Sequence, residues 1–182
     1  MIGSSNPIRD LDLMAVSTGV GERRMVMANR GLSGIDGVVS TAIGVALARR
    51  PTRALAYVGD LTFLHDTNAL LIGPDEPRPD LTVIVLNDDG GAIFAGLEPG
   101  APAHAGSFER VFATPTGADL SALCAAHGLR HRRVADERSL NRALAEAPHG
   151  IEVIEVTMSR GDRRQLDRRL REAVARTWGQ AS

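Results

Sequence analysis

The chain has 182 residues and a formal net charge of -1; 43% of its residues are hydrophobic, 24% are charged and 3% are aromatic. These values predict one globular domain over 1–182 and argue against nucleic acid as a partner, because basic and aromatic side chains would be needed to bind it. Cys124 stands alone, which excludes a disulfide framework, and no apolar stretch reaches the roughly 18 to 20 residues of a membrane span, so we expect a cytoplasmic protein.

Turn residues divide the first half of the chain into alternating helices and strands. Asn6-Pro7 is typical of a helix start, with Asn6 as the N-cap and Pro7 at the first helical position. No strand is expected before it, which predicts that the chain is a piece of something longer. Further along we expect a short strand over 24–28, a helix over 37–49, an apolar strand over 53–58 and a helix over 62–72.

The second half continues the alternation around one unbroken apolar run. Residues 81–86 (LTVIVL) are typical of a central strand in a parallel sheet, because helices cover both faces of such a strand. The pattern predicts an α/β fold with a doubly wound, mostly parallel sheet and helices on both faces. The remaining expectations are helices over 92–97, 119–127, 137–147 and 162–176, a Pro/Gly-rich loop over 98–106, and strands over 130–134 and 151–156.

Acidic clusters follow two neighbouring strands. One contains Asp60, and the other is 87–90 (NDDG), 28 residues further on (88 minus 60). In sheets of this kind ligands bind beyond the carboxyl ends of the strands, and Mg²⁺ takes oxygen ligands that it shares with phosphates. We therefore predict a magnesium and diphosphate site formed by Asp60, Asp88 and the Gly90 carbonyl, with Asn87 as the alternative to Asp88. Mn²⁺ suits the same oxygen ligands.

Each cluster also has a structural interpretation. Asp60 alone would serve as the N-cap of the helix that follows, and residues 87–90 alone would form a turn. The two clusters together, each between a strand and a helix, favour the metal site. Helices that start near Thr62 and Gly91 would also direct partial positive charge at the diphosphate.

The two clusters resemble the signature of thiamine-diphosphate enzymes, in which Gly-Asp-Gly is followed at a similar spacing by Asn-Asn. Leu61 stands in place of the last glycine of that signature, and Asp88 in place of its second asparagine. The Asp88 carboxylate still offers an oxygen and adds one negative charge. The resemblance implies thiamine diphosphate as the cofactor, with contacts from Gly59, Asp60, Leu61, Thr62, Asp88, Gly90 and Gly91.

Residues 29–37 (NRGLSGIDG) are too rich in glycine for a strand and predict a shaped loop before a helix. This segment closely resembles the menaquinone-pathway synthases often called MenD, and the likeness extends to 3–10 (GSSNPIRD), 59–70 (GDLTFLHDTNAL) and 90–97. By its position Ile35 resembles the apolar residue that holds the cofactor in a bent conformation. A hydrophobic staple for the next helix is the alternative. The alanine- and arginine-rich composition is similar to that of mycobacterial members.

The family's reaction implies roles for the remaining residues. It decarboxylates 2-oxoglutarate and adds the succinyl group to isochorismate, and arginine binds such carboxylates with a two-pronged fork. The resemblance places Ser5 and Arg9 at substrate-contacting positions, and we expect Arg9 and Arg30, at loop or helix-start positions, to bind the carboxylates; surface ion pairs are the alternative for the two arginines. Three further residues would line the cofactor and substrate pocket and exclude water, or else pack a short helix on the core: Ile93, Phe94 and Leu97.

The resemblance also implies that part of the enzyme lies outside this chain. In the family, the glutamate that activates the cofactor belongs to a pyrimidine-binding domain, usually of a neighbouring subunit, and neither that domain nor the middle domain has a counterpart here. We therefore expect no catalytic residue in this chain, no activity of the chain alone, and a homo-oligomeric full enzyme. The alternatives are another thiamine-diphosphate carboligase or decarboxylase, similar to acetolactate synthase, and a noncatalytic cofactor-binding or oligomerisation module.

Overall fold

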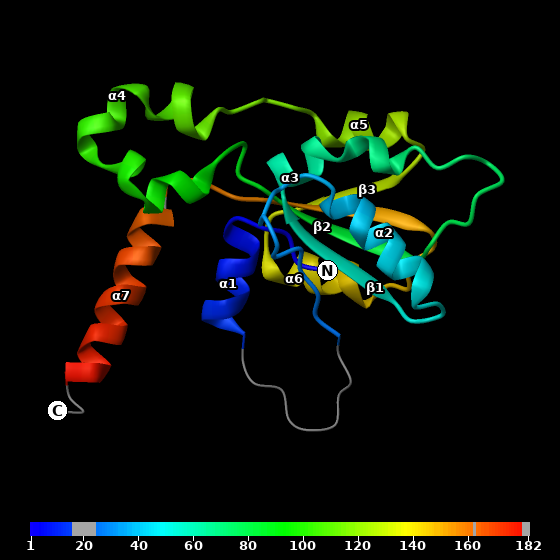
Figure 1. Ribbon diagram of the computed structural model, residues 1–182, viewed down its shortest axis with the longest axis horizontal. Helices are drawn as coiled ribbons and strands as arrows, with labels where there is room; N and C mark the ends of the chain where they lie inside the picture. The colour runs from blue at the N-terminus through cyan, green and yellow to red at the C-terminus, as the bar shows by residue number, and fades with distance from the viewer. Residues whose placement is uncertain (16–24, 162, 180–182) are drawn as a thin grey trace. The chain divides into compact units, whose positions relative to one another are not determined.

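The computed structural model describes residues 1–15, 25–161 and 163–179. Its centre is a sheet of four parallel strands in the order β1-β2-β4-β3 (Figure 1). β4 therefore lies out of chain order, between β2 and β3. This is the parallel α/β fold that the sequence predicts. The strands are β1 (Ala54–Gly59), β2 (Leu81–Asn87), β3 (Arg130–Val134) and β4 (Ile151–Thr157).

The chain divides into two compact units. The first consists of residues 1–87 and 118–157 and contains the whole sheet. The second consists of residues 88–117 and the described residues from 158 onward. The chain passes from the first unit to the second directly after the last residue of β2.

Helices cover both faces of the sheet in the first unit. The main hydrophobic core lies on one face, where side chains of three helices pack against β1, β2 and β4: α2 (Val38–Ala48), α3 (Asp60–His65) and α5 (Leu120–Ala126). On the other face α6 (Glu137–Ala145) packs Ala143 against Val134 and Ile154. Because strand side chains alternate between faces, Val153 belongs to the first core and Ile154 to the second.

The start of the chain runs beside β1. Ile2 forms parallel bridges to both Tyr57 and Ala28, and the Gly3 amide donates to the Tyr57 carbonyl at 2.8 Å. Among the described residues no strand precedes the first helix, as expected, and Ile2 contributes isolated bridges instead. The strand predicted over 24–28 is reduced to the bridge at Ala28, and residue 24 lies outside the described residues.

Two predicted helices differ in their details. The first, α1 (Asn6–Met14), has Ser5 rather than Asn6 as its N-cap residue. The helix predicted over 62–72 is broken: α3 ends at His65, and the 3-10 helix η1 (Thr67–Leu70) follows. The break falls at Asp66, whose carboxylate accepts hydrogen bonds from the Ser40 amide at 2.7 Å and the Ser40 hydroxyl at 2.9 Å. Asp66 makes this contact with α2 at the point where the predicted helix would have continued.

The second unit consists largely of short helical turns. The expected loop over 98–106 is wound into turns, two of which carry proline in their first positions, where its missing amide hydrogen costs nothing. Phe112 holds the turns together, with its ring 6.0 Å from that of Phe94 and 6.2 Å from that of Phe108. The elements are η2 (Ala92–Gly96), η3 (Glu98–Gly100), η4 (Pro102–His104), α4 (Ala105–Phe108), the π-helical turn η5 (Glu109–Ala113) and α7 (Arg163–Gly179).

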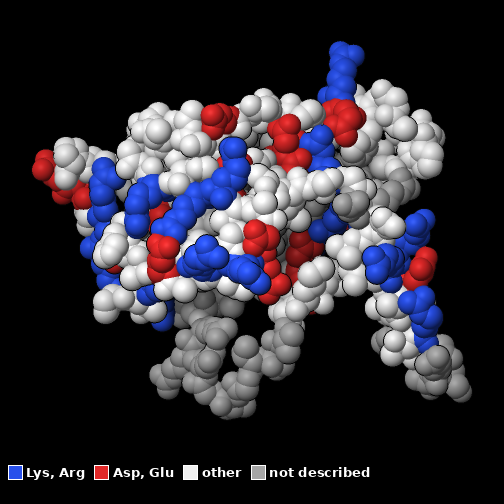
Figure 2. Space-filling model, turned by 180° about the vertical axis from the view of Figure 1, so that it is seen from behind, with Lys and Arg blue, Asp and Glu red and all other residues white. Residues whose placement is uncertain are grey.

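Charged side chains are interspersed on the surface. On the face shown in Figure 2, basic side chains have carboxylates among them, as suits a chain with a net charge of -1. Within the described ranges, no helix combines the length and the apolar character that crossing a membrane requires.

Candidate functional site

Asp60 is the first residue after β1 and the first residue of α3. The N-cap position of α3 belongs to Gly59, so the interpretation of Asp60 as a helix cap is wrong. Asp60 is only 4% exposed and Thr62 only 2%. A buried carboxylate requires compensating charge or hydrogen bonds, and a divalent cation is one group that would provide it. Leu61, between them, is half-buried.

Asn87 ends the neighbouring strand at the same edge of the sheet. Gly59 pairs with Leu86, so Asp60 and Asn87 each follow a paired residue at the carboxyl end. The Asn87 amide nitrogen Nδ2 donates to Oε1 of Glu155 at 2.7 Å. Glu155 is 1% exposed and is also bonded by His131 and Arg133. The side chain of Asn87 is therefore held by β4.

The loop after Asn87 opens the second unit and is held by its own contacts. Nη1 of Arg160 donates to the Asp88 carbonyl at 2.8 Å and to the Asp89 carbonyl, and Nη2 pairs with Glu109 at 2.6 Å. Asp89 has φ 56, and its Oδ1 accepts hydrogen bonds from the amides of residues 116 and 117 at 3.0 and 2.9 Å. The loop is thus more than a local turn, because side chains distant in sequence define its path.

Gly90 occupies a position that admits no side chain. Its φ is 140, and a Cβ there would lie 2.2 Å from the Ala113 carbonyl oxygen. The Gly91 amide donates to that same carbonyl at 2.8 Å. The Gly90 carbonyl accepts a hydrogen bond from the Ala92 amide at 3.1 Å. The backbone of residues 112 and 113 approaches so closely that residues 90 and 91 have no room for a side chain.

The apolar residues of η2 fall in the second unit. Ile93 and Phe94 are half-buried, and Leu97 is exposed. Phe94 packs on Phe112. This contact agrees with the alternative in which the side chain packs a short helix. Leu97, at 44% exposed, has no such explanation.

The loop and helix residues of the predicted substrate site lie in the first unit. Because residues 1–3 run parallel to β1, Ser5 follows at the carboxyl end of the sheet, where its φ of 72 turns the chain into α1. Arg9 and Arg30 are exposed, and neither forms an ion pair with a described residue. Ile35 is half-buried and lies outside both hydrophobic clusters of the described chain.

The predicted metal ligands come from both units. Asp60 belongs to the first unit, and Asp88 and Gly90 belong to the second, so the complete set remains a prediction. Each part fits a cation: Asp60 is buried, Oδ1 of Asp88 is buried, and Gly90 brings backbone close. Among the described residues there is no cluster of three His, Cys, Asp or Glu side chains suited to a metal.

Sequence reasoning missed Glu155 and Arg160. The signal for Glu155 is its position inside an apolar strand (IEVIEVT), where a carboxylate is costly unless it is paired. Arg160 follows that strand in a charged stretch whose pattern suggests only a solvated helix. Its contacts to two backbone carbonyls have no sequence signature.

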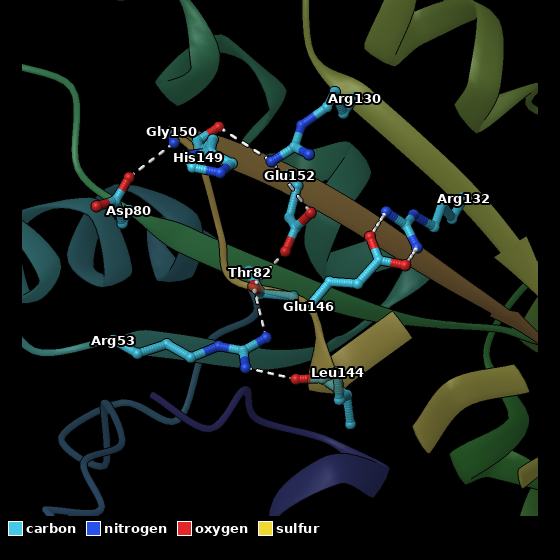
Figure 3. A network of polar contacts seen from close by, with 10 residues as sticks. All are labelled: Arg53, Asp80, Thr82, Arg130, Arg132, Leu144, Glu146, His149, Gly150 and Glu152. Atoms are coloured by element: carbon cyan, nitrogen blue, oxygen red, sulfur yellow. Dashed lines mark hydrogen bonds and ion pairs between the residues drawn. The ribbon is translucent and has the colours of Figure 1, made fainter. Parts of the chain in front are cut away.

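The opposite end of the sheet carries a second polar network (Figure 3). Glu152 accepts a hydrogen bond from Thr82 at 2.8 Å and pairs with Arg130 at 3.4 Å. Nearby, Arg132 binds Glu146 through both of its terminal nitrogens, and this hydrogen bonding lowers the pKa of Glu146 and raises the pKa of Arg132. These residues lie toward the amino ends of the strands, away from the predicted site.

Comparisons with known proteins agree with the fold. The family described as thiamine pyrophosphate enzyme, C-terminal TPP binding domain, matches residues 13–176. The 2-succinyl-5-enolpyruvyl-6-hydroxy-3-cyclohexene-1-carboxylate synthase of Nocardioides sp. is 56% identical over 172 residues, which cover 94% of this chain and 32% of the relative. The protein of the same name from Nocardia farcinica is 53% identical over 176 residues, covering 96% and 31%.

A solved structure shows the same fold. The thiamine diphosphate-dependent 4-hydroxybenzoylformate decarboxylase of Rhodococcus jostii matches with a TM-score of 0.53 and 21% identity, over 67% of this chain and 23% of its own. The chain spans about a third of the length of the curated relatives it matches. On the extent of the family match, the chain belongs to the C-terminal TPP-binding domains of thiamine pyrophosphate enzymes.

Proposed function

We propose that this chain is the diphosphate-binding domain of a cytoplasmic 2-succinyl-5-enolpyruvyl-6-hydroxy-3-cyclohexene-1-carboxylate synthase. The full enzyme would decarboxylate 2-oxoglutarate and add the succinyl group to isochorismate in menaquinone biosynthesis. The observation that carries the proposal is the 56% identity to a synthase of that name over 94% of this chain. The two units would act together as one domain over 1–182.

Asp60, Asp88 and the Gly90 carbonyl would hold Mg²⁺, or Mn²⁺, together with the diphosphate of the cofactor. The burial of Asp60 and the close backbone at Gly90 support these roles. The flanking residues Gly59, Leu61, Thr62 and Gly91 would contact the cofactor. When bound, thiamine diphosphate supplies the reactive carbon that takes up the acyl group and accepts the electrons released by decarboxylation.

The chain's other residues would bind substrate and shape the cofactor. Arg9 and Arg30 would bind the substrate carboxylates together with Ser5, and both arginines are exposed and form no ion pair with a described residue. Ile35 would hold the cofactor bent, which agrees with its half-buried place outside the hydrophobic clusters. Water would be excluded by Ile93, Phe94 and Leu97.

The activating glutamate would come from a pyrimidine-binding domain outside this chain. The chain covers 32% of the Nocardioides relative, so most of such an enzyme would consist of other domains. The full enzyme would be a homo-oligomer, because a neighbouring subunit would complete each site. No residue of this chain is assigned the role of general base, and the chain alone would form no product.

Calorimetry tests the cofactor site. The chain is titrated with Mg²⁺ in the presence of saturating thiamine diphosphate, first alone and then with the upstream domains of the Nocardioides relative added. We expect saturable binding that Asp60→Ala weakens by at least about 100-fold, the upper end of what loss of an outer-shell partner costs. Asp80→Ala is the matched control, since Asp80 is exposed and accepts a hydrogen bond from the Gly150 amide at 2.7 Å. Binding that is absent, or unaffected by Asp60→Ala, would contradict the proposal.

The substrates need a second experiment with the upstream domains present. We expect consumption of 2-oxoglutarate together with isochorismate, and a raised KM for 2-oxoglutarate in Arg30→Lys, because lysine lacks the bidentate fork. Turnover of pyruvate instead would identify the chain as part of an acetolactate synthase-like enzyme.

A further inference from the structure

We propose that Glu155 is a positioning residue for the magnesium and diphosphate site: it fixes the side chain of Asn87, the residue directly before the proposed ligand Asp88. The inference rests on the proposed function, since it assigns an outer-shell partner to that same site. It concerns residues of the first unit and the one peptide bond that leads from Asn87 to Asp88.

Glu155 is a carboxylate with almost no access to water. It is 1% exposed, and each of its oxygens is bonded by a donor from another strand. Oε1 accepts from Nδ2 of Asn87 at 2.7 Å. Oε2 lies 2.8 Å from Nε2 of His131 and accepts from Nε of Arg133 at 3.1 Å. One buried side chain therefore joins β2, β3 and β4 near their carboxyl ends.

The chemistry of Glu155 determines which way the Asn87 amide faces. Oε1 of Glu155 accepts this hydrogen bond, so Asn87 presents its NH₂ group to the carboxylate. The carbonyl oxygen Oδ1 is then turned away from Glu155. An amide that is free to rotate would offer Oδ1 in many directions, whereas this one is restricted to a single orientation.

The position in the strand links this contact to the metal loop. Glu155 pairs with Val85, and Asn87 follows two residues later on the same face of the sheet. Asn87 is the last residue of β2 and the last before the Asp88 carbonyl that Arg160 holds at 2.8 Å. Anchoring the Asn87 side chain therefore restricts the last residue of β2, which directly precedes Asp88.

The contact gives Glu155 an outer-shell role at the end of β2. Glu155 supports Asn87, the residue that directly precedes the proposed ligand Asp88. In metal sites, loss of such an outer-shell partner typically costs 10- to 100-fold in affinity. A contact that only joined strands would lower stability and leave the affinity for metal unchanged.

The test compares Glu155→Gln with Glu152→Gln in the full chain. Glu152 is the matched control because it is also buried, at 5% exposed, and lies on the same strand at the other end of the sheet. Mg²⁺ is titrated in saturating thiamine diphosphate, and thermal unfolding is followed in parallel. We expect Glu155→Gln to weaken Mg²⁺ binding by about 10- to 100-fold and Glu152→Gln to change it by less than about twofold, although both lower the unfolding temperature.

Asn87→Ala serves as a second variant that removes the same contact without leaving a buried carboxylate uncompensated, since His131 and Arg133 remain. It should weaken Mg²⁺ binding to a similar extent, and the double variant with Glu155→Gln should be no weaker than either single one. The NMR signal of the Asn87 side-chain amide, identified by its loss in Asn87→Ala, should shift in Glu155→Gln even without metal. That shift reports the contact independently of any activity.

Two results would overturn the inference in distinguishable ways. If the unmodified chain binds Mg²⁺ and cofactor and Glu155→Gln binds them equally well, Glu155 has no positioning role and the proposed function stands. If the unmodified chain, with the upstream domains added, binds neither, then the proposed function fails and this inference fails with it.

Discussion

Glu152 and Glu155 lie on the same strand, and both are buried, yet they serve opposite ends of the sheet. Their side chains point to opposite faces, because positions separated by an odd number of residues alternate in a strand. Glu152 bonds Thr82 and Arg130 near the strand starts. Glu155 bonds Asn87, which is the last residue of β2.

The difference shows that a buried carboxylate is not by itself evidence of a functional site. Both glutamates are compensated by an arginine and by a neutral donor from β2. What separates them is the chain that follows the donor: beyond Thr82 the strand continues, and beyond Asn87 the predicted metal loop begins. We expect the contacts at the amino end of the sheet to contribute mainly to stability. The contacts at the carboxyl end are expected to contribute to ligand binding.

The largest expected effect is at the loop that leaves the carboxyl end. In Gly90→Ala the new Cβ would lie 2.2 Å from the Ala113 carbonyl, at φ 140, so the loop must move. We expect Mg²⁺ affinity, measured by calorimetry, to fall by at least about 100-fold. Gly128→Ala is the control: Gly128 has φ 66 and open space around its Cβ position, and it precedes β3 at the amino end. Equal Mg²⁺ affinities of Gly90→Ala and Gly128→Ala would contradict the distinction between the carboxyl and amino ends of the sheet.

The next effect is a loss of stability at the amino end. Glu152→Ala leaves the buried Thr82 hydroxyl without its acceptor and Arg130 without its carboxylate. Urea unfolding should show the free energy of unfolding lowered by about 1 to 3 kcal/mol, with Mg²⁺ affinity unchanged. A clear loss of affinity in Glu152→Ala would mean that the two ends are coupled.

A smaller effect is expected on acidification. Hydrogen bonding lowers the pKa of Asp136 below its ordinary 3.8, mainly through the Ser139 amide, and lowers the pKa of Glu146 below 4.5 through Arg132. Depressed carboxyl pKa values stabilise the fold above the ordinary values, and that stability is lost as pH falls through the lower, folded values. Free energies of unfolding measured from about pH 6 to pH 2 should fall less steeply in Asp136→Asn and Glu146→Gln. Parallel curves for parent and variants would contradict these assignments.

The smallest effect concerns the lone thiol. Burial raises the pKa of Cys124 to about 11, and the Glu155 carboxylate adds to the shift. We expect the thiol to resist alkylation near neutral pH and its thiolate absorbance to appear only in strong alkali. Glu155→Gln should lower the thiol pKa slightly, and Glu152→Gln should leave it unchanged. A thiol pKa that changes in Glu152→Gln and not in Glu155→Gln would contradict this prediction.

Local patterns were enough to predict most of the elements. The apolar run of β2, the strand before Asp60 and the helices α2, α5 and α6 are found within one to two residues of their predicted bounds. The helix over 62–72 failed because Phe63 and Leu70 are both buried, which imitates one continuous helical face, while Asp66 binds Ser40 instead. The spacing of apolar residues along the chain indicates which positions are buried. It does not indicate that a side chain such as Asp66 binds a residue of another helix.

The sequence by itself determined the α/β class, the positions of Asp60 and residues 87–90 after their strands, and the likeness to thiamine-diphosphate enzymes. Only the tertiary structure decided which polar groups meet. Asn87 and Glu155 are 68 residues apart, and they bond because β4 inserts between β2 and β3, contrary to chain order. Strand order depends on packing across the whole sheet, so a residue's neighbours along the chain cannot reveal its partner on another strand.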